Sequence, residues 1–142
     1  MWSDTIQVTT SSRSAAVDIT RAVSAKIQER KVSQGLCVVY VPHTTAGVTI
    51  NEGADPAVMD DVMTMLDSMV PWRGPYKHME GNSAAHIKTS LVGSSVQILV
   101  EKGRLQLGTW QRIFLCEFDG PRTRKVRIAL IPAPTQQAHL PS

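Results

Sequence analysis

The sequence predicts a single α+β domain in which a mixed or antiparallel sheet packs with two or three helices. The chain has 142 residues, the length of one ordinary domain. Hydrophobic residues make up 42% of it and charged residues 19%, values typical of a globular protein. Strand-like and helix-like patterns alternate without an internal repeat or a dividing linker. We therefore expect one domain over residues 1–131 and a proline-rich tail over residues 132–142.

The first third of the chain predicts a strand, a helix and a second strand. Trp2–Thr10 alternates loosely between apolar and polar residues, which favours a strand. Ser14 is placed to cap a helix that runs to about Arg30 and buries Ala16, Ile19, Val23 and Ile27. Gly35–Pro42 is strongly apolar, as expected of a central strand, and residues 46–51 are compatible with a further short strand.

The middle of the chain predicts a helix and then a long irregular segment. Asp55 followed by Pro56 is a strong helix start, because a side-chain cap precedes a proline at the first helical position. The helix is expected to reach about Met69 and to bury Val58, Val62, Met65, Leu66 and Met69. Two prolines and two glycines make residues 71–82 irregular, and long loops of this kind are often functional.

The last third predicts a short helix and two hairpins. Asn82 or Ser83 caps the helix, and Gly93 ends it in a left-handed conformation. The first hairpin joins strands at 95–101 and 104–107 around Lys102-Gly103, and the second joins strands at 109–118 and 123–131 around 119–121.

Composition argues against several classes of protein. No apolar run approaches the ~20 residues that span a bilayer, and Met1–Asp4 does not resemble the start of a secretory signal. Cys37 and Cys116 lie in apolar runs, as buried, reduced thiols of a cytoplasmic protein do. The net charge is +3, and the basic residues near the end have no interleaved aromatic platform: Arg122, Arg124, Lys125 and Arg127. We therefore expect no membrane and no nucleic-acid partner.

Three histidines occupy places where chemistry is often found. His43 ends the apolar strand, His78 lies in the irregular loop, and His86 shares a helix face with Asn82. Three neutral imidazoles with an open fourth position suit zinc or a similar divalent ion. No HEXXH or CXXC motif is present, so the pattern leaves open whether the three histidines converge.

Two carboxylates stand out beside the histidines. Glu52 lies in the loop that follows His43, where no helix cap explains it. Glu117 lies on an alternating strand and shares a face with Gln111, Ile113 and Leu115. Partial desolvation would raise its pKa. Glu117 is therefore a general base, a magnesium ligand, or the buried ion-pair partner of Arg122 or Arg124, and we favour the last.

Anion binding has a diffuse signal. Neither a Walker loop nor a GxGxxG motif is present. The start of the helix near Asn82 offers free backbone N–H groups, and Lys88 follows one turn later. Other residues able to hold an anion are Thr44, Thr45, Gly47, Ser83 and Arg122.

An ordered set of motifs resembles one family over nearly the whole chain up to about residue 131. The motifs are His43-Thr44-Thr45-Ala46, Asn51-Glu52, Tyr76-x-His78, Gly81-Asn82 leading to His86-Ile87-Lys88, Leu91-x-Gly93, Gly108-x-Trp110-Gln111 and Glu117-x-Asp119-Gly120-Pro121-Arg122-x-Arg124. Together they resemble the YjbQ-like family, described as secondary thiamine-phosphate synthases.

The resemblance implies a compact α+β fold, homotrimers with polar pockets near subunit boundaries, and a low transferase activity. That activity joins a pyrimidine methyl diphosphate to a thiazole phosphate and releases diphosphate. By resemblance, the catalytic candidates are His43, Glu52, His78, His86 and Glu117. The candidates for binding the phosphorylated substrates are Thr44, Thr45, Asn51, Asn82, Lys88, Gln111 and Arg122. A divalent metal, zinc or magnesium, would be held by the three histidines.

Three other functions stay open from the residues alone. The same histidines would serve a metal-dependent hydrolase that activates water. A non-catalytic module that binds an anionic metabolite, or a structural trimer without a ligand, would use the same fold for a different purpose.

Overall fold

The computed structural model describes residues 1–134, and most of the predicted tail, with His139, lies outside the described residues. In chain order the described part forms β1 (Trp2–Thr9), β2 (Ala15–Asp18), α1 (Thr20–Glu29), β3 (Gly35–Tyr40), β4 (Ala46–Glu52), α2 (Pro56–Met69), α3 (Ser83–Val92), β5 (Ser95–Glu101), β6 (Arg104–Leu105), β7 (Gln111–Glu117) and β8 (Thr123–Pro132). None of these helices is long and apolar enough to cross a bilayer.

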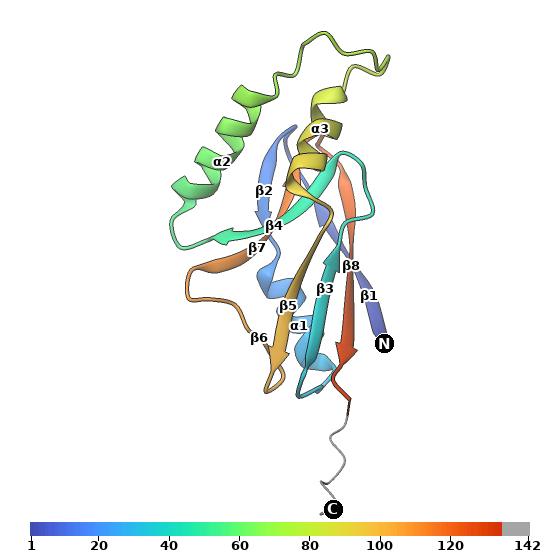
Figure 1. The fold of residues 1–142 in the computed structure, drawn as a ribbon, viewed down its shortest axis with the longest axis vertical. Coiled ribbons are helices and arrows are strands. Elements are labelled where there is room, and N and C mark those ends of the chain that lie inside the picture. The colour runs from blue at the N-terminus through green and yellow to red at the C-terminus, as the bar shows by residue number, and fades with distance from the viewer. Residues whose placement is uncertain (135–142) are drawn as a thin grey trace, which may run out of the picture.

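The strands form two antiparallel sheets, as shown in Figure 1. One sheet has the order β1-β8-β3-β5-β6, and the other has the order β2-β7-β4. Val23 and Ile27 of α1 share one hydrophobic core with Val39 and Ile128 of the larger sheet and Leu115 of the smaller one. The predicted α+β class, with an antiparallel sheet and three helices, is confirmed.

The second face of the smaller sheet is covered by α2 and α3. Because side chains alternate along β7, Phe114 and Cys116 point away from the main core. They pack with Met59 of α2 and Ala85 of α3. Both cysteines are free and buried, as predicted, and burial raises the pKa of each thiol to about 12.

The prediction of a helix from Ser14 to Arg30 is wrong in its first third. Residues 15–18 form β2, which runs antiparallel to β7 with Asp18 opposite Phe114. The helix begins only at Thr20, whose N–H donates to the Asp18 carboxylate at 2.9 Å. The apolar residues in this segment fit either a helix or a strand, and pairing with β7 makes residues 15–18 a strand.

The predicted hairpin between residues 109–118 and 123–131 is also wrong. The two segments form β7 and β8, but they belong to different sheets. Strand β8 lies between β1 and β3, whereas β7 lies between β2 and β4. The turn at 119–121 therefore carries the chain from one sheet to the other, and the first hairpin, β5–β6, forms as predicted.

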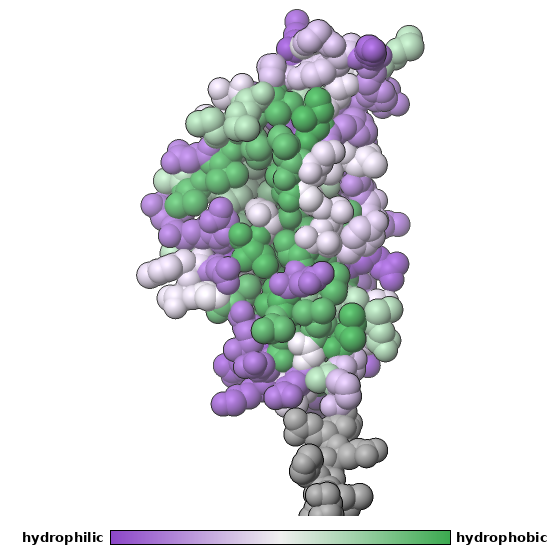
Figure 2. All heavy atoms as spheres, viewed as in Figure 1, coloured by the Kyte–Doolittle hydropathy of each residue, from purple (hydrophilic) through white to green (hydrophobic). Residues whose placement is uncertain are grey.

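Helix α2 spans the predicted residues, but its methionines do not all fill the core. The Asp55 carboxylate accepts the N–H of Ala57 at 3.0 Å and caps the helix as expected. Met65 and Met69 are 59% and 63% exposed. Ile87 and Leu91 of α3 and Leu99 of β5 are exposed as well. Figure 2 shows apolar surface over α2, α3 and β5, and we call the five exposed residues on these elements the apolar face.

Candidate functional site

Four connections meet at one end of the domain, the upper end in Figure 1. They are residues 9–14, 41–45, 78–86 and 117–125, and we call this region the pole. Backbone hydrogen bonds join three of them: Thr10 donates to the Arg122 carbonyl at 2.8 Å, and Phe118 donates to the Thr45 carbonyl at 3.1 Å. The side chain of Asn82 joins residues 78–86 to Asp119. The pole gathers most of the motif residues, because strands of both sheets end or begin there.

A buried ion pair between Glu117 and Arg124 lies at the centre of the pole. Arg124 Nε donates to Glu117 Oε1 at 2.9 Å, and its Nη2 donates to Oε2. Thr10 Oγ1 donates to the same carboxylate at 2.7 Å. Arg124 also donates to the hydroxyl and carbonyl of Thr45. The favoured interpretation of Glu117, an ion-pair partner of an arginine, is confirmed, with Arg124 as the partner.

The expected rise in the pKa of Glu117 is wrong in direction. Burial does raise the pKa of this carboxyl, and it is the largest single influence. Hydrogen bonds from Arg124, from Thr10 and from the Asp119 backbone favour the ionised form and together outweigh it. The pKa of Glu117 is therefore lowered, and a fully buried, ionised carboxylate serves to hold Arg124 rather than to take up protons.

His43 is fixed in one tautomer at the surface of this network. Its Nε2 accepts the backbone N–H of Lys125 at 2.9 Å, so its proton lies on Nδ1. Burial lowers the pKa of His43, and the nearby Arg124 cation lowers it further. A neutral imidazole with Nδ1–H free to donate is suited to bind an anion or a leaving group.

Asp119 connects the first turn of α3 to Arg122. Asn82 Nδ2 donates to Asp119 Oδ2 at 2.9 Å, and Arg122 Nη2 donates to the same oxygen at 3.0 Å. Asn82 occupies the cap position of α3 without making a side-chain cap bond. Its Oδ1 is buried and has no hydrogen-bond partner among the described residues. The Asp119 carboxylate thus holds the guanidinium of Arg122 near the start of α3.

The histidines meet only as a pair. The rings of His78 and His86 are 5.3 Å apart between centroids in an edge-to-face arrangement, in a shallow hollow beside Tyr76 and Ser83. His43 instead bonds β8 through Lys125. Within residues 1–134 no three His, Cys, Asp or Glu side chains are placed to hold a metal ion. The described residues of one chain therefore do not fit the three-histidine metal site that we predicted.

Lys88, a predicted phosphate ligand, is buried and already paired. Its ammonium forms an ion pair with Asp67 of α2 and lies 5.9 Å from the centre of the Phe118 ring. Its side chain is 3% exposed. The charge of Lys88 therefore serves to fasten α3 to α2.

Three other predicted residues lie at the opposite end of the smaller sheet. In the β4–β7 register, Glu52 is opposite Gln111 and Asn51 is opposite Arg112. Gln111 accepts the N–H of Gly108, and Asn51 accepts the N–H of Glu52. These residues are far from His43 because strand β4 runs away from it toward Glu52. The order of the motifs along the chain does not indicate this direction.

Thr10 is a residue of the pole that the sequence interpretation missed. It bonds the Glu117 carboxylate and also receives the N–H of Arg122 at 2.9 Å. Thr44, in contrast, is exposed, and Thr45 is buried against Arg124. The only local signal for Thr10 is its place at the end of a strand, which many threonines share.

Comparison with known proteins gives a consistent result. The profile of the family described as UPF0047 protein YjbQ-like matches residues 4–133. The UPF0047 protein YugU of Bacillus subtilis is 52% identical over 128 residues, which cover 89% of this chain and 97% of that one. A UPF0047 protein of Methanocaldococcus jannaschii is 50% identical over 125 residues, with 88% and 91% covered.

Solved structures agree in fold. An uncharacterised conserved protein of the YjbQ/UPF0047 family from Clostridium acetobutylicum is 53% identical with a TM-score of 0.88, covering 90% of this chain and 99% of that one. A hypothetical protein from Aeropyrum pernix is 39% identical with a TM-score of 0.90, covering 94% and 100%. The names of these proteins report no activity.

Proposed function

The chain belongs to the YjbQ-like UPF0047 family, and from the geometry of the pole we propose that it is a small-molecule transferase with thiamine-phosphate synthase activity. The reaction joins a pyrimidine methyl diphosphate to a thiazole phosphate. The observation that carries the proposal is the Asp119 carboxylate, which holds Arg122 beside the first turn of α3. A guanidinium next to free helix N–H groups is a site for phosphate.

Donors from three places in the pole are suited to neutralise a diphosphate. Arg122 is exposed, and its guanidinium is oriented by Asp119. The N–H groups of Ser83 and Ala84 have no hydrogen-bond partner among the described residues. His43 offers Nδ1–H from the neighbouring connection. All three carry positive or partly positive charge, and no proton has to leave any of them.

The proposed reaction needs charge stabilisation more than acid–base work. The bond between the pyrimidine methylene and the diphosphate oxygen breaks, and its electron pair leaves with the diphosphate. The lone pair of the thiazole nitrogen then forms the new C–N bond. Donors placed where negative charge develops lower such a barrier, and holding both substrates together supplies further rate. No step is assigned to a metal, because the described residues of one chain assemble no three-ligand group.

A second subunit is part of the proposal. The apolar face consists of Met65, Met69, Ile87, Leu91 and Leu99, and Ile87 also lines the hollow of His78 and His86. Contiguous exposed apolar surface of this kind is typical of protein interfaces. We expect a homotrimer in which a neighbour covers this face and completes the site. A divalent ion shared between subunits stays a prediction, which elemental analysis of untagged protein tests.

The experiment mixes purified protein with the pyrimidine methyl diphosphate and the thiazole phosphate and measures thiamine phosphate as a fluorescent oxidation product. We expect Arg122→Gln and His43→Gln to lower kcat at least tenfold, because each removes a donor from the leaving group. Arg104→Gln is the matched control, since Arg104 is exposed on β6 at the other end of the domain.

Absence of product with the unmodified protein overturns the assigned activity. Product formed at unchanged rate by both variants overturns the site while leaving the activity in place. Circular dichroism of each variant checks that the fold is retained.

A further inference from the structure

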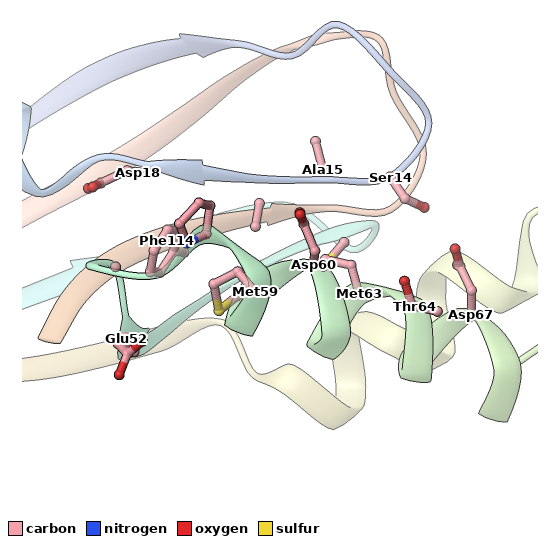
Figure 3. Close-up of a pocket in the computed structure, with 13 residues that line it drawn as sticks. Ser14, Ala15, Asp18, Glu52, Met59, Asp60, Met63, Thr64, Asp67 and Phe114 are labelled. Carbon is pink, nitrogen blue, oxygen red and sulfur yellow. The ribbon is translucent and has the colours of Figure 1, made fainter. Parts of the chain in front are cut away.

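A cleft outside the pole lies between α2 and β2, and Figure 3 shows its two walls. Its volume is about 490 Å³, within the range of pockets that bind small molecules. None of the residues that we predicted for the phosphorylated substrates lines it, and of the catalytic candidates it contains only Glu52. The cleft is therefore a second feature of this domain that needs its own explanation.

The walls of the cleft are acidic. Asp60 and Asp67 project from α2 toward β2 in Figure 3, and Asp18 lies on the opposite wall. Among residues 1–134, no Lys, Arg or His side chain lines the cleft. Lys88 neutralises Asp67, but Asp60 has neither a hydrogen bond nor an ion pair within residues 1–134. A chain with a net charge of +3 thus keeps a negatively charged cleft.

Two arginines adjoin the cleft without forming an ion pair with its carboxylates in the described part of the chain. Arg21 and Arg112 line an adjoining hollow that shares Asp18, but neither lies within ion-pair distance of its carboxylate in the described part of the chain. Arg112 instead donates to the carbonyl of Gln111 at 2.8 Å. Helix α2 also places Asp60 in its second turn, beyond the N–H groups that an acidic residue would cap.

The floor of the cleft is apolar. Phe114 of β7 and Met59 of α2 lie between the two walls in Figure 3, and Met63 continues the floor along the helix. The face of an aromatic ring attracts cations, and methionine side chains adapt to ligands of different shape. Carboxylates above an aromatic and thioether floor are complementary to a cation with an apolar body.

The same observations argue against other occupants. The carboxylates are spread along both walls and form no three-ligand group for a metal ion within the described residues. Strand β2 is an edge strand of only four residues, too short to pair with a peptide strand of ordinary length. A phosphorylated substrate would be repelled by Asp60 and Asp18.

From this geometry we infer that the cleft between α2 and β2 is a binding site for a small organic cation, a primary or quaternary amine that carries an aromatic or branched apolar group. The ammonium lies beside Asp60, whose carboxylate accepts its N–H groups or faces its charge, and Asp18 adds negative charge farther along the opposite wall. The apolar group lies on Phe114 and Met63. This site is separate from the pole and does not depend on the proposed transferase activity.

The test uses the full chain with phenethylamine as the probe and phenethyl alcohol as its neutral counterpart. Methyl-labelled methionines report the place of binding by NMR. We expect the methyl signals of Met59 and Met63 to shift, while those of Met65 and Met69, which are exposed outside the cleft, stay in place. The amine should bind at least fivefold more tightly than the alcohol.

Two variants on adjacent residues separate the cleft from general surface charge. Asp60→Asn should weaken binding of the amine about fivefold, the upper end for a solvent-exposed pair, and should leave the alcohol unchanged. Asp61→Asn, whose residue does not line the cleft, should change the affinity less than twofold. Both residues are exposed on α2, so both variants are expected to fold.

Three results would overturn the inference. Amine and alcohol binding with equal affinity would mean that the charge plays no part. Equal effects of the two variants would mean that the cleft is not the place of binding. Shifts at Met65 and Met69 without shifts at Met59 and Met63 would assign the amine to the apolar face instead.

Discussion

Replacing Glu117 by glutamine should destabilise the domain strongly, although the change removes a single charge. Glu117 is fully buried, and its carboxylate receives two hydrogen bonds from Arg124, one from Thr10, and one each from the backbone of Phe118 and Asp119. An ionised carboxylate accepts at both oxygens. A glutamine amide accepts at only one and turns two donors toward the remaining N–H groups.

The magnitude follows from what Glu117→Gln leaves behind. If the amide nitrogen replaces Oε1, it faces Arg124 Nε and Thr10; if it replaces Oε2, it faces two backbone N–H groups and Arg124 Nη2. In either orientation the guanidinium stays buried without a counter-charge. Removing one partner of a buried ion pair costs about 3–5 kcal/mol. For a chain of this length the melting temperature should fall by roughly 10–20 °C.

The assay is urea unfolding followed by circular dichroism, which gives the free energy of unfolding of Glu117→Gln and of the unmodified protein. Glu101→Gln is the matched control, because Glu101 is exposed on β5 and should change stability by less than about 0.5 kcal/mol. A double variant, Glu117→Leu with Arg124→Met, should recover part of the loss, since no buried charge is left unpaired, while Thr10 and the Asp119 N–H still lose their acceptor. A loss below about 1 kcal/mol in Glu117→Gln would refute the reasoning.

Three further predictions concern local features. Burial and Arg124 lower the pKa of His43, so just below pH 6.5 the unfolded chain binds more protons than the folded one. The stability that depends on neutral His43 is therefore present above that pH and lost as the pH falls. The melting temperature of His43→Gln should decline less than that of the unmodified protein between pH 7 and 5. Asp55→Ala should cost about 1 kcal/mol in urea unfolding, because α2 loses its cap. Gly47→Ala should cost about 1–3 kcal/mol, because a Cβ would lie 2.5 Å from the Gly93 carbonyl oxygen; an unchanged value would mean that β4 and α3 separate freely.

The sequence correctly predicts those helices and strands whose ends are set by residues close by in the chain. The cap at Asp55, the turn at Lys102-Gly103 and the apolar run from Gly35 each gave the right element. Residues 15–18 failed because their strand state depends on β7, about a hundred residues away. The turn at 119–121 was located correctly, but nothing in its own sequence tells that the strands on either side pair in different sheets.

The same distinction holds for the site. From the sequence, an ion pair with Arg122 or Arg124 is the favoured interpretation of Glu117, and the structure shows that the partner is Arg124. Thr10 could not be predicted, because its hydrogen bond to Glu117 joins residues that are 107 positions apart in the chain. Lys88 had the right charge for a phosphate ligand, yet its pairing with Asp67 follows from the packing of α3 on α2, which no local pattern contains.

Burial and the neighbouring ion pair together set the protonation of His43. Burial lowers its pKa most, Arg124 lowers it further, and Glu117 acts in the opposite direction and limits the effect. The backbone N–H of Lys125 then selects the tautomer with a proton on Nδ1. His43 is thereby a donor over the whole range in which it is neutral. In the proposed reaction, Glu117 and Arg124 act as positioning residues for the His43 donor, and neither of them contacts the substrate.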